Sequence, residues 1–169
     1  MNGLLIGRFQ PFHSGHLDAV LFALSRVENL WIGIGSSNKH NEKRNPFTAD
    51  ERREMIVSSI KPSIIDRTSI FNIPDVDDHE KWTFEIDQIV PKYDIVFTND
   101  EFTKTLFEKR KIDVIPVVLK DREKFSGTNI RDLITDDKNW QDLVPHGTRK
   151  VLDKINACLL YTSPSPRDS

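Results

Sequence analysis

Short apolar runs alternate with stretches of helical periodicity along most of this chain. A short apolar run that ends at glycine or at a polar residue is typical of a buried strand, and apolar residues spaced three or four apart are typical of an amphipathic helix. The pattern predicts strands over 4–6, 30–34, 69–73, 95–98 and 114–119. Between and after them it predicts helices over 16–26, from 48 to near 62, and over 81–89, 101–109, 128–134 and 148–156.

One predicted helix carries its own start and stop signals. Thr48 can accept a hydrogen bond from the first turn while Glu51 reaches back to it, a capping box that stabilises a helix by about 1 kcal/mol. Pro62 disfavours helical geometry in the residue before it. We therefore expect this helix to begin after Thr48 and to end near Pro62.

The alternation of strands and helices indicates an α/β fold. Such connections favour parallel pairing with right-handed crossovers, so we expect one domain over 1–158, an open parallel sheet with helices on both faces. In open parallel sheets, ligands bind beyond the carboxyl ends of the strands. The loops that should converge on one site follow Ile6, Ile34, Ile73, Thr98 and Leu119.

The composition mainly excludes classes of protein and of partner. Of 169 residues, 37% are hydrophobic and 30% charged, and no apolar run approaches the roughly 20 residues that span a bilayer. The single cysteine, Cys158, cannot form an internal disulfide, and Met1 leads almost directly into the first strand, so we expect a cytoplasmic protein. A net charge of −2 argues against nucleic acid as a partner, and we expect no membrane partner.

The last residues differ from the rest of the chain. Residues 159–169 (LLYTSPSPRDS) contain two prolines and no periodicity. We expect a disordered tail there, and the abrupt change indicates a processing or assembly scar rather than native sequence. We expect no functional role for this segment.

The most informative motif is the turn over 7–16, GRFQPFHSGH, between the first strand and the first helix. A strand-to-helix turn offers free backbone N–H groups and the positive end of a helix dipole, where polyphosphate binds. Arg8, His13 and His16 add a cation and two imidazoles, and Gly15 lets the backbone approach a ligand closely. The alternatives are a structural pair of surface histidines and a pair of zinc ligands. Zinc needs a third ligand, however, and the chain has neither a Cys pair nor a Glu-x-x-His motif to supply one.

A second motif, SGTNIR over 126–131, opens another predicted helix. This small, hydroxyl-rich turn again presents backbone N–H groups. Arg131 lies one helical turn inside, so its guanidinium should point back toward the N-terminal end, where a phosphate would lie. Alone the motif is weak, because serine and threonine caps are common. Together with the histidine turn it predicts two helix N-termini, each with its own cation, that grip two ends of one triphosphate.

Other residues admit more than one interpretation. Arg44 could bind phosphate or lie in solvent, and Asp75 could accept hydrogen bonds from a ribose or an amide or simply face water. Trp82 could belong to the core or stack on a flat ring. The remaining basic residues and histidines are expected at the solvated surface: Lys39, Lys43, Arg52, Arg53, His40, His79 and His146.

These motifs resemble those of the nucleotidylyltransferase superfamily, which are a His/Thr-x-Gly-His turn and a Ser/Thr-rich turn ending in arginine. Within it, the chain is similar to the archaeal-type nicotinamide-nucleotide adenylyltransferases. The similarity rests on the histidine turn, on GIGSS over 33–37, on RNPFTADER over 44–52 and on SGTNIR. Asp75 and Trp82, seven residues apart, also resemble an aspartate and a tryptophan of that family. The match covers about 1–156.

The resemblance implies a Rossmann-like fold and a reaction in which nicotinamide mononucleotide and ATP give NAD and pyrophosphate, with Mg²⁺ accompanying ATP and no metal site on the protein. It implies that the histidines contact ATP phosphates, that the arginines hold phosphate groups and that Trp82 stacks on the nicotinamide ring. The catalytic candidates are His13, His16, Arg44 and Arg131. The substrate-binding candidates are Gly7, Arg8, Phe9, Gly15, Gly35, Ser36, Asp75, Trp82, Ser126, Gly127 and Thr128.

Two other functions fit the same motifs. One is transfer of AMP or CMP to a different phosphate acceptor, which Trp82 and the loop around it would decide. The other is a non-catalytic nucleotide sensor, although such sensors often lose a histidine or the late arginine, and both are present here. The segment VDDHEK over 76–81 is acidic where the family is commonly rich in asparagine, and extra carboxylates favour a cationic nicotinamide over its acid analogue. The sequence leaves open whether identical subunits associate into an oligomer.

Overall fold

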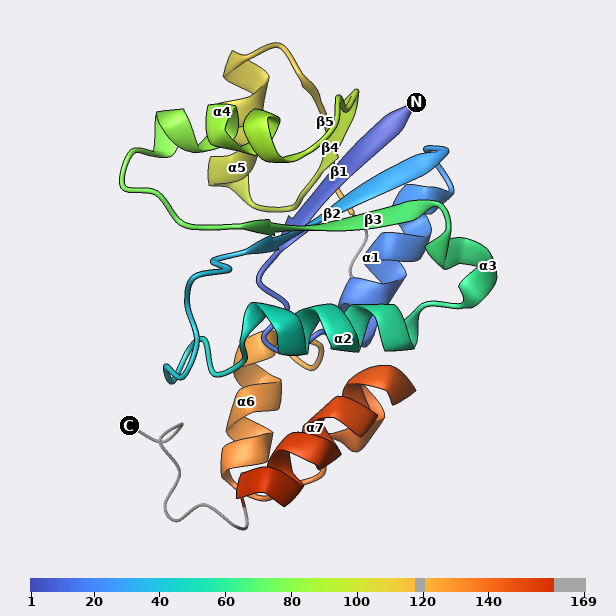
Figure 1. The fold of residues 1–169 in the computed structure, drawn as a ribbon, viewed down its shortest axis with the longest axis vertical. Helices are drawn as coiled ribbons and strands as arrows, with labels where there is room; N and C mark the ends of the chain where they lie inside the picture. Colours follow the sequence, from blue (N-terminus) through green and yellow to red (C-terminus); the bar gives the residue numbers. More distant parts are fainter. Residues whose placement is uncertain (118–120, 160–169) are drawn as a thin grey trace.

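The fold is built on a five-stranded parallel sheet (Figure 1). The computed structural model describes residues 1–117 and 121–159. The strands are β1 Asn2–Gly7, β2 Asn29–Gly35, β3 Thr68–Ile73, β4 Ile95–Phe97 and β5 Asp113–Ile115. They lie in the order β3-β2-β1-β4-β5. The chain thus adds β2 and β3 on one side of β1, and β4 and β5 on the other, which makes the β1–β4 pair the switch point beside which such sheets bind ligands.

Helices cover both faces of the sheet, with α1 and α2 on one face and α4 and α5 on the other (Figure 1). The α-helices are α1 Ser14–Leu24, α2 Ala49–Ser59, α3 Pro62–Ile65, α4 His79–Ile89, α5 Glu101–Lys109, α6 Gly127–Thr135 and α7 His146–Leu159, and Gln141–Leu143 forms a 3-10 turn. Because successive strand residues point to opposite faces, Leu4 packs with Ile86 and Phe107, whereas Leu5 joins the larger core beneath α1 and α2. Both faces are therefore buried, as the continuous apolar strands predict.

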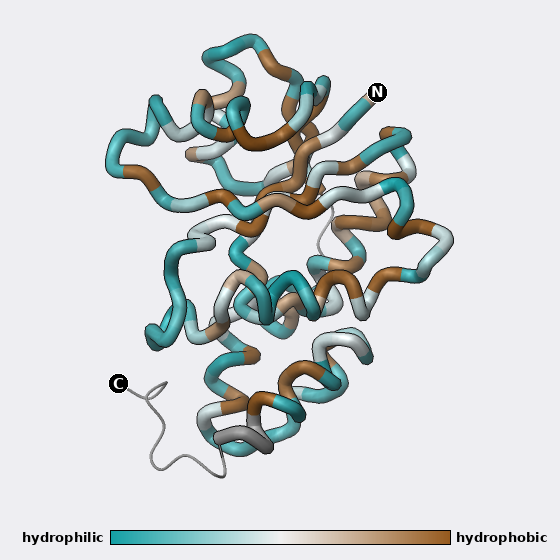
Figure 2. Tube along the Cα trace, viewed as in Figure 1, coloured by the Kyte–Doolittle hydropathy of each residue, from teal (hydrophilic) through white to brown (hydrophobic). Residues whose placement is uncertain are grey.

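Helices α6 and α7 form a further layer beyond α2 (Figure 1). The Thr148 hydroxyl donates a hydrogen bond to the carbonyl oxygen of Phe12 over 2.7 Å, which ties α7 to the histidine turn. Gly147 lies so close to the end of α2 that an added Cβ would come within 2.3 Å of the Ser58 carbonyl carbon. Hydropathy along the trace shows apolar positions concentrated in the strands and a hydrophilic stretch after β2 (Figure 2).

The predicted α/β architecture is confirmed, with differences at element ends. Helix α1 begins at Ser14 rather than His16, because His13 caps it. Pro62 opens the short helix α3, which the sequence pattern did not predict. The strand predicted over 114–119 is shorter in the structure, because β5 ends at Ile115 and residues 116 and 117 belong to no strand; residues 118–120 lie outside the described residues. The predicted tail also lies outside them, apart from Leu159 at the end of α7. No helix in 1–117 and 121–159 is long and apolar enough to cross a membrane.

Candidate active site

The two histidines of the turn after β1 cap helix α1 with their own side chains. The backbone N–H of His16 donates to Nδ1 of His13 over 3.3 Å, and the backbone N–H of His13 donates to Nδ1 of His16 over 3.1 Å. The two rings stack with their centroids 3.6 Å apart. Because each Nδ1 accepts a hydrogen bond, a neutral ring must carry its proton on Nε2. The turn therefore presents two Nε2–H donors at a helix N-terminus.

Both imidazoles are held in the neutral form. Burial lowers the pKa of His13 from its ordinary value to about 4. Burial also lowers the pKa of His16 well below the ordinary value, and the neighbouring charge of His13 would lower it further. Charged imidazoles are therefore disfavoured near neutral pH, which leaves hydrogen-bond donation and the helix dipole as the means by which the pair can attract an anion.

Two phenylalanine rings of the same turn pack against His16. The Phe9 ring meets His16 edge-on at a centroid distance of 4.9 Å, and Phe12 stacks on His16 at 5.8 Å. Phe9 is 2% exposed, which leaves its backbone, and not its ring, to face a ligand. An added Cβ at Gly15 would lie 2.9 Å from the His13 ring, so glycine is required for this stacking.

Helix α6 brings the second predicted motif to the same place. The Arg131 guanidinium donates to the carbonyl oxygen of Gln10, inside the histidine turn, over 2.8 Å, and to the Thr128 hydroxyl over 3.3 Å. Ser126 caps the helix by accepting from the Asn129 N–H. An added Cβ at Gly127 would lie 3.3 Å from the Gln10 carbonyl oxygen, so the two helix openings meet at close range. The predicted convergence of the two motifs is confirmed.

Three arginines from distant segments lie near one another. Arg131 is half-buried, whereas Arg8 and Arg44 are exposed. Burial lowers the pKa of Arg131, and the positive charges of Arg44 and Arg8 lower it further. Like charges held this close repel one another, so the arrangement suits an anion that would neutralise them.

The carboxyl end of β2 contributes a second polar group. The Ser36 hydroxyl, next to Gly35 at the end of that strand, donates to a carboxylate oxygen of Asp75 over 2.9 Å. The backbone N–H of Asp75 donates to the side chain of Asn38 over 3.1 Å. Gly7 ends the adjacent strand β1, so these residues border the same end of the sheet.

Trp82 is placed by helix α4. Its ring is half-buried and contacts Phe107 with a centroid distance of 6.3 Å, within the smaller core. Asp78 caps the helix one turn earlier and joins it to the loop that carries Asp75. The core interpretation is thus correct for one side of the ring, and stacking on a ligand remains a prediction for the rest.

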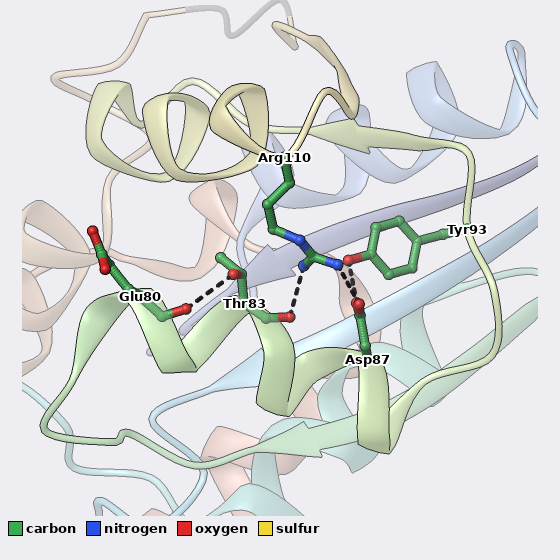
Figure 3. A network of polar contacts seen from close by, with 5 residues as sticks. All are labelled: Glu80, Thr83, Asp87, Tyr93 and Arg110. Atoms are coloured by element: carbon green, nitrogen blue, oxygen red, sulfur yellow. Dashed lines mark hydrogen bonds and ion pairs between the residues drawn. The ribbon is translucent and has the colours of Figure 1, made fainter.

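A polar network farther along α4 holds that helix against α5 (Figure 3). Arg110 donates to the Thr83 carbonyl oxygen over 3.0 Å and pairs with the Asp87 carboxylate. The Tyr93 hydroxyl donates to the same carboxylate over 2.6 Å. Burial raises the pKa of Tyr93, and the hydrogen bond to Asp87 raises it further. Through the Thr83 carbonyl oxygen, the network binds the backbone next to Trp82 and so holds α4, the helix that carries Trp82, in place.

Two important residues were missed or misassigned by sequence reasoning. Arg52 was expected in solvent, which is wrong, because its side chain is 0% exposed. The available signal was its spacing, since Arg52 shares one buried face of α2 with Met55 and Ile56 at the i, i+3, i+4 positions. Gln10 carries no such signal in the sequence, yet its buried amide exchanges two hydrogen bonds with the backbone of Phe47 and so ties the histidine turn to the start of α2.

The other surface predictions have mixed outcomes. His40, His79 and His146 are exposed, as predicted, and so is Lys43. Lys39 is half-buried. Arg53 is also half-buried, because it donates to the Ile70 carbonyl oxygen and the Asn72 side chain of β3.

Comparison with known proteins identifies the group to which this site belongs. The cytidylyltransferase-like family model matches residues 4–133. A nicotinamide-nucleotide adenylyltransferase from Methanococcus aeolicus is 36% identical over 156 residues, and the match covers 92% of this chain and 90% of that protein. A nicotinamide-nucleotide adenylyltransferase from Thermococcus sibiricus is 37% identical over 157 residues, and the match covers 92% of this chain and 84% of that protein. The chain belongs to the cytidylyltransferase-like family. Within that family it groups with these archaeal nicotinamide-nucleotide adenylyltransferases.

A solved structure supports the fold of this family member. A bifunctional NMN adenylyltransferase/ADP ribose pyrophosphatase from Francisella tularensis, complexed with AMP and a manganese ion, superposes with a TM-score of 0.76 at 21% identity. The alignment covers 92% of this chain, which spans about half of that protein (49%). At this identity the likeness shows the fold alone. The Rossmann-like nucleotidylyltransferase architecture is therefore confirmed.

Proposed function

We propose that this cytidylyltransferase-like protein is a nicotinamide-nucleotide adenylyltransferase, which makes NAD and pyrophosphate from ATP and nicotinamide mononucleotide. The observation that carries the proposal is the meeting of two helix openings, α1 with its neutral histidine pair and α6 with Arg131. The names of the archaeal relatives favour this pair of substrates.

In the proposed reaction, a phosphate oxygen of the mononucleotide attacks the α-phosphorus of ATP, and the bond to the bridging oxygen breaks as pyrophosphate leaves. The attacking oxygen is already ionised near neutral pH, so no general base is needed. Catalysis then consists of positioning two anions in line and stabilising the negative charge that spreads over the phosphates. The Nε2–H groups of His13 and His16 and the guanidinium of Arg131 supply that stabilisation.

The remaining cations and polar groups bind the two nucleotides. Arg8 and Arg44 offset the repulsion between the incoming phosphate and the triphosphate. The Asp75 carboxylate, held by Ser36, is placed to accept a hydrogen bond from a ribose or an amide. The exposed part of Trp82 stacks on the nicotinamide ring. In each case the proposed ligand group complements the side chain in charge or in shape.

A divalent metal fits this site as part of the substrate. Magnesium prefers oxygen ligands, keeps several waters and is bound largely through substrate phosphates in nucleotide enzymes. In the part of the chain that the structure describes, no group of three or more His, Cys, Asp or Glu side chains is placed to hold a metal ion. We propose that Mg²⁺ enters with ATP, where it would neutralise phosphate charge, and that the enzyme acts in the cytoplasm on small molecules alone.

A coupled pyrophosphate assay tests the proposed function. The protein is incubated with ATP and a panel of acceptor phosphates, with and without Mg²⁺. We expect rapid pyrophosphate release with nicotinamide mononucleotide, formation of NAD, and loss of activity without the metal. Preference for another acceptor would make the protein a different nucleotidylyltransferase. Binding of NAD by calorimetry with no pyrophosphate release would make it a nucleotide sensor.

A further inference from the structure

Arg52 of α2 is a buried cation that lies behind the candidate site. All five hydrogen bonds of its guanidinium go to backbone carbonyl oxygens. Burial lowers the pKa of Arg52 to about 10. A charge buried in this way has a free-energy cost that its hydrogen bonds must offset. A residue needed to fill this face of α2 would be apolar, as Met55 and Ile56 are, so Arg52 has a different purpose.

Four of the five acceptors of Arg52 belong to three segments that border the site. One is Arg8, in the turn after β1, at 3.0 Å. Gly35 and Ser36 accept at the end of β2, at 2.8 and 3.2 Å. Lys39, in the polar stretch that leads to Arg44, accepts at 3.2 Å. The fifth acceptor is Thr48, the cap of α2 itself, at 3.1 Å.

These contacts set the orientation of peptide groups in the loops. In a planar trans peptide, the C=O of one residue and the N–H of the next point in opposite directions. Because the carbonyls of Arg8 and Gly35 point at Arg52, the N–H groups of Phe9 and Ser36 point away from it. Both residues also have positive φ values, 55° and 50°, which their side chains disfavour and which therefore need outside support.

We propose that Arg52 is a positioning residue for nucleotide transfer, which locks the turn after β1, the end of β2 and the polar stretch into one arrangement. In that arrangement Arg8, Ser36 and Arg44 serve the same pair of ligands. The inference rests on the proposed function. Arginine is required because a planar fork with five N–H donors can satisfy several carbonyls at once, whereas the ammonium of lysine cannot reach them all.

The test compares Arg52→Lys with a matched control on the same helix. The control is Arg53→Lys, since Arg53 is the neighbouring arginine and binds β3 rather than the site loops. Amide hydrogen exchange is measured over 7–10 and 35–40, and kcat and KM are measured for both substrates. In Arg52→Lys we expect exchange there to rise at least about tenfold. We expect kcat to fall roughly a hundredfold, as for misplaced reacting groups, with a smaller change in KM. Arg53→Lys should match the wild type in amide exchange and in its kinetic constants.

Each result decides the proposal. Unchanged exchange in both segments of Arg52→Lys overturns it, and so does faster exchange with an unchanged kcat. If Arg52→Lys does not fold, Arg52→Met avoids a buried ammonium and is measured in the same way. If the wild type makes no NAD, the proposed function fails, and ATP affinity by calorimetry replaces kcat. A tenfold weaker affinity in Arg52→Lys than in Arg53→Lys then supports the positioning role, and equal affinities contradict it.

Discussion

At the scale of single residues, the proposed chemistry depends on which nitrogen of each imidazole is free to donate a hydrogen bond to the ligand. The Nδ1 atoms of His13 and His16 accept backbone N–H groups, which leaves Nε2–H as the donor in both rings. Neutral donors aimed at developing charge act without having to release a proton during the reaction. The lowered pKa values keep the donors in this form across the neutral pH range.

His16→Ala should lower turnover far more than it weakens nucleotide binding. One donor directed at the transition state is worth about 3 kcal/mol, so we expect kcat to fall roughly a hundredfold while both KM values stay within a few-fold. Steady-state kinetics with each substrate varied in turn provide the measurement. His146→Ala, which alters an exposed histidine on α7, is the control. A change confined to KM would remove His16 from the transition state.

Arg131→Lys should be costly although the charge is kept. The guanidinium already binds the Gln10 carbonyl oxygen and still has donors for a phosphate, a combination that an ammonium does not reproduce. Losing one charge-assisted hydrogen bond, worth about 1.5–3 kcal/mol, should lower kcat/KM roughly ten- to a hundredfold. The matched control is Arg149→Lys on the exposed side of α7. Equal kcat/KM values for the two variants would show that Arg131 merely covers the surface.

At the scale of elements, the N-terminus of α1 links stability to pH. The pKa of His13 is about 4 in the folded chain and 6.5 without the fold, so between these values the unfolded chain binds a proton that the folded chain does not. Stability from this source is therefore complete above about pH 6.5 and is lost as the pH falls toward 4. From His13 alone we expect the free energy of unfolding to be about 2 kcal/mol lower at about pH 5 than at about pH 7.5.

Denaturant unfolding at the two pH values measures this effect. His13→Asn is the comparison, because asparagine is a good helix cap that does not titrate. The pH-dependent loss should shrink by about 2 kcal/mol in the variant. An equal loss in wild type and variant would assign the pH dependence to other groups.

Elements with a strong local signal could be predicted from the sequence, and those that depend on distant contacts could not. The capping box of Thr48 and Glu51 marked the start of α2, and both of its hydrogen bonds are present. Helix α1 begins at Ser14, two residues before its predicted start, since a histidine cap has no common sequence signature. Nothing local to Arg52 shows that carbonyls from three separate segments surround it, although its spacing placed it on the buried face.

At the scale of the whole molecule, strand order creates the site. Placing β1 between β2 and β4 brings the histidine turn next to the end of β2, and the layer formed by α6 and α7 brings Arg131 over the same turn. The sequence predicted that the loops meet, because parallel strands end at one edge of a sheet. It also predicted that the histidine turn and the SGTNIR turn meet, but it could not predict the contact that joins them, since the bond between Gln10 and Arg131 links residues 121 positions apart.

The most direct measurement is a crystal structure with nicotinamide mononucleotide and an ATP analogue that cannot be cleaved between the α- and β-phosphates. The account predicts a triphosphate that spans the two helix openings, within about 3 Å of Nε2 of His16 and of the Arg131 guanidinium. The mononucleotide phosphate should lie in line with the α-phosphorus. A triphosphate bound at one helix opening alone, away from Arg131, would contradict the account.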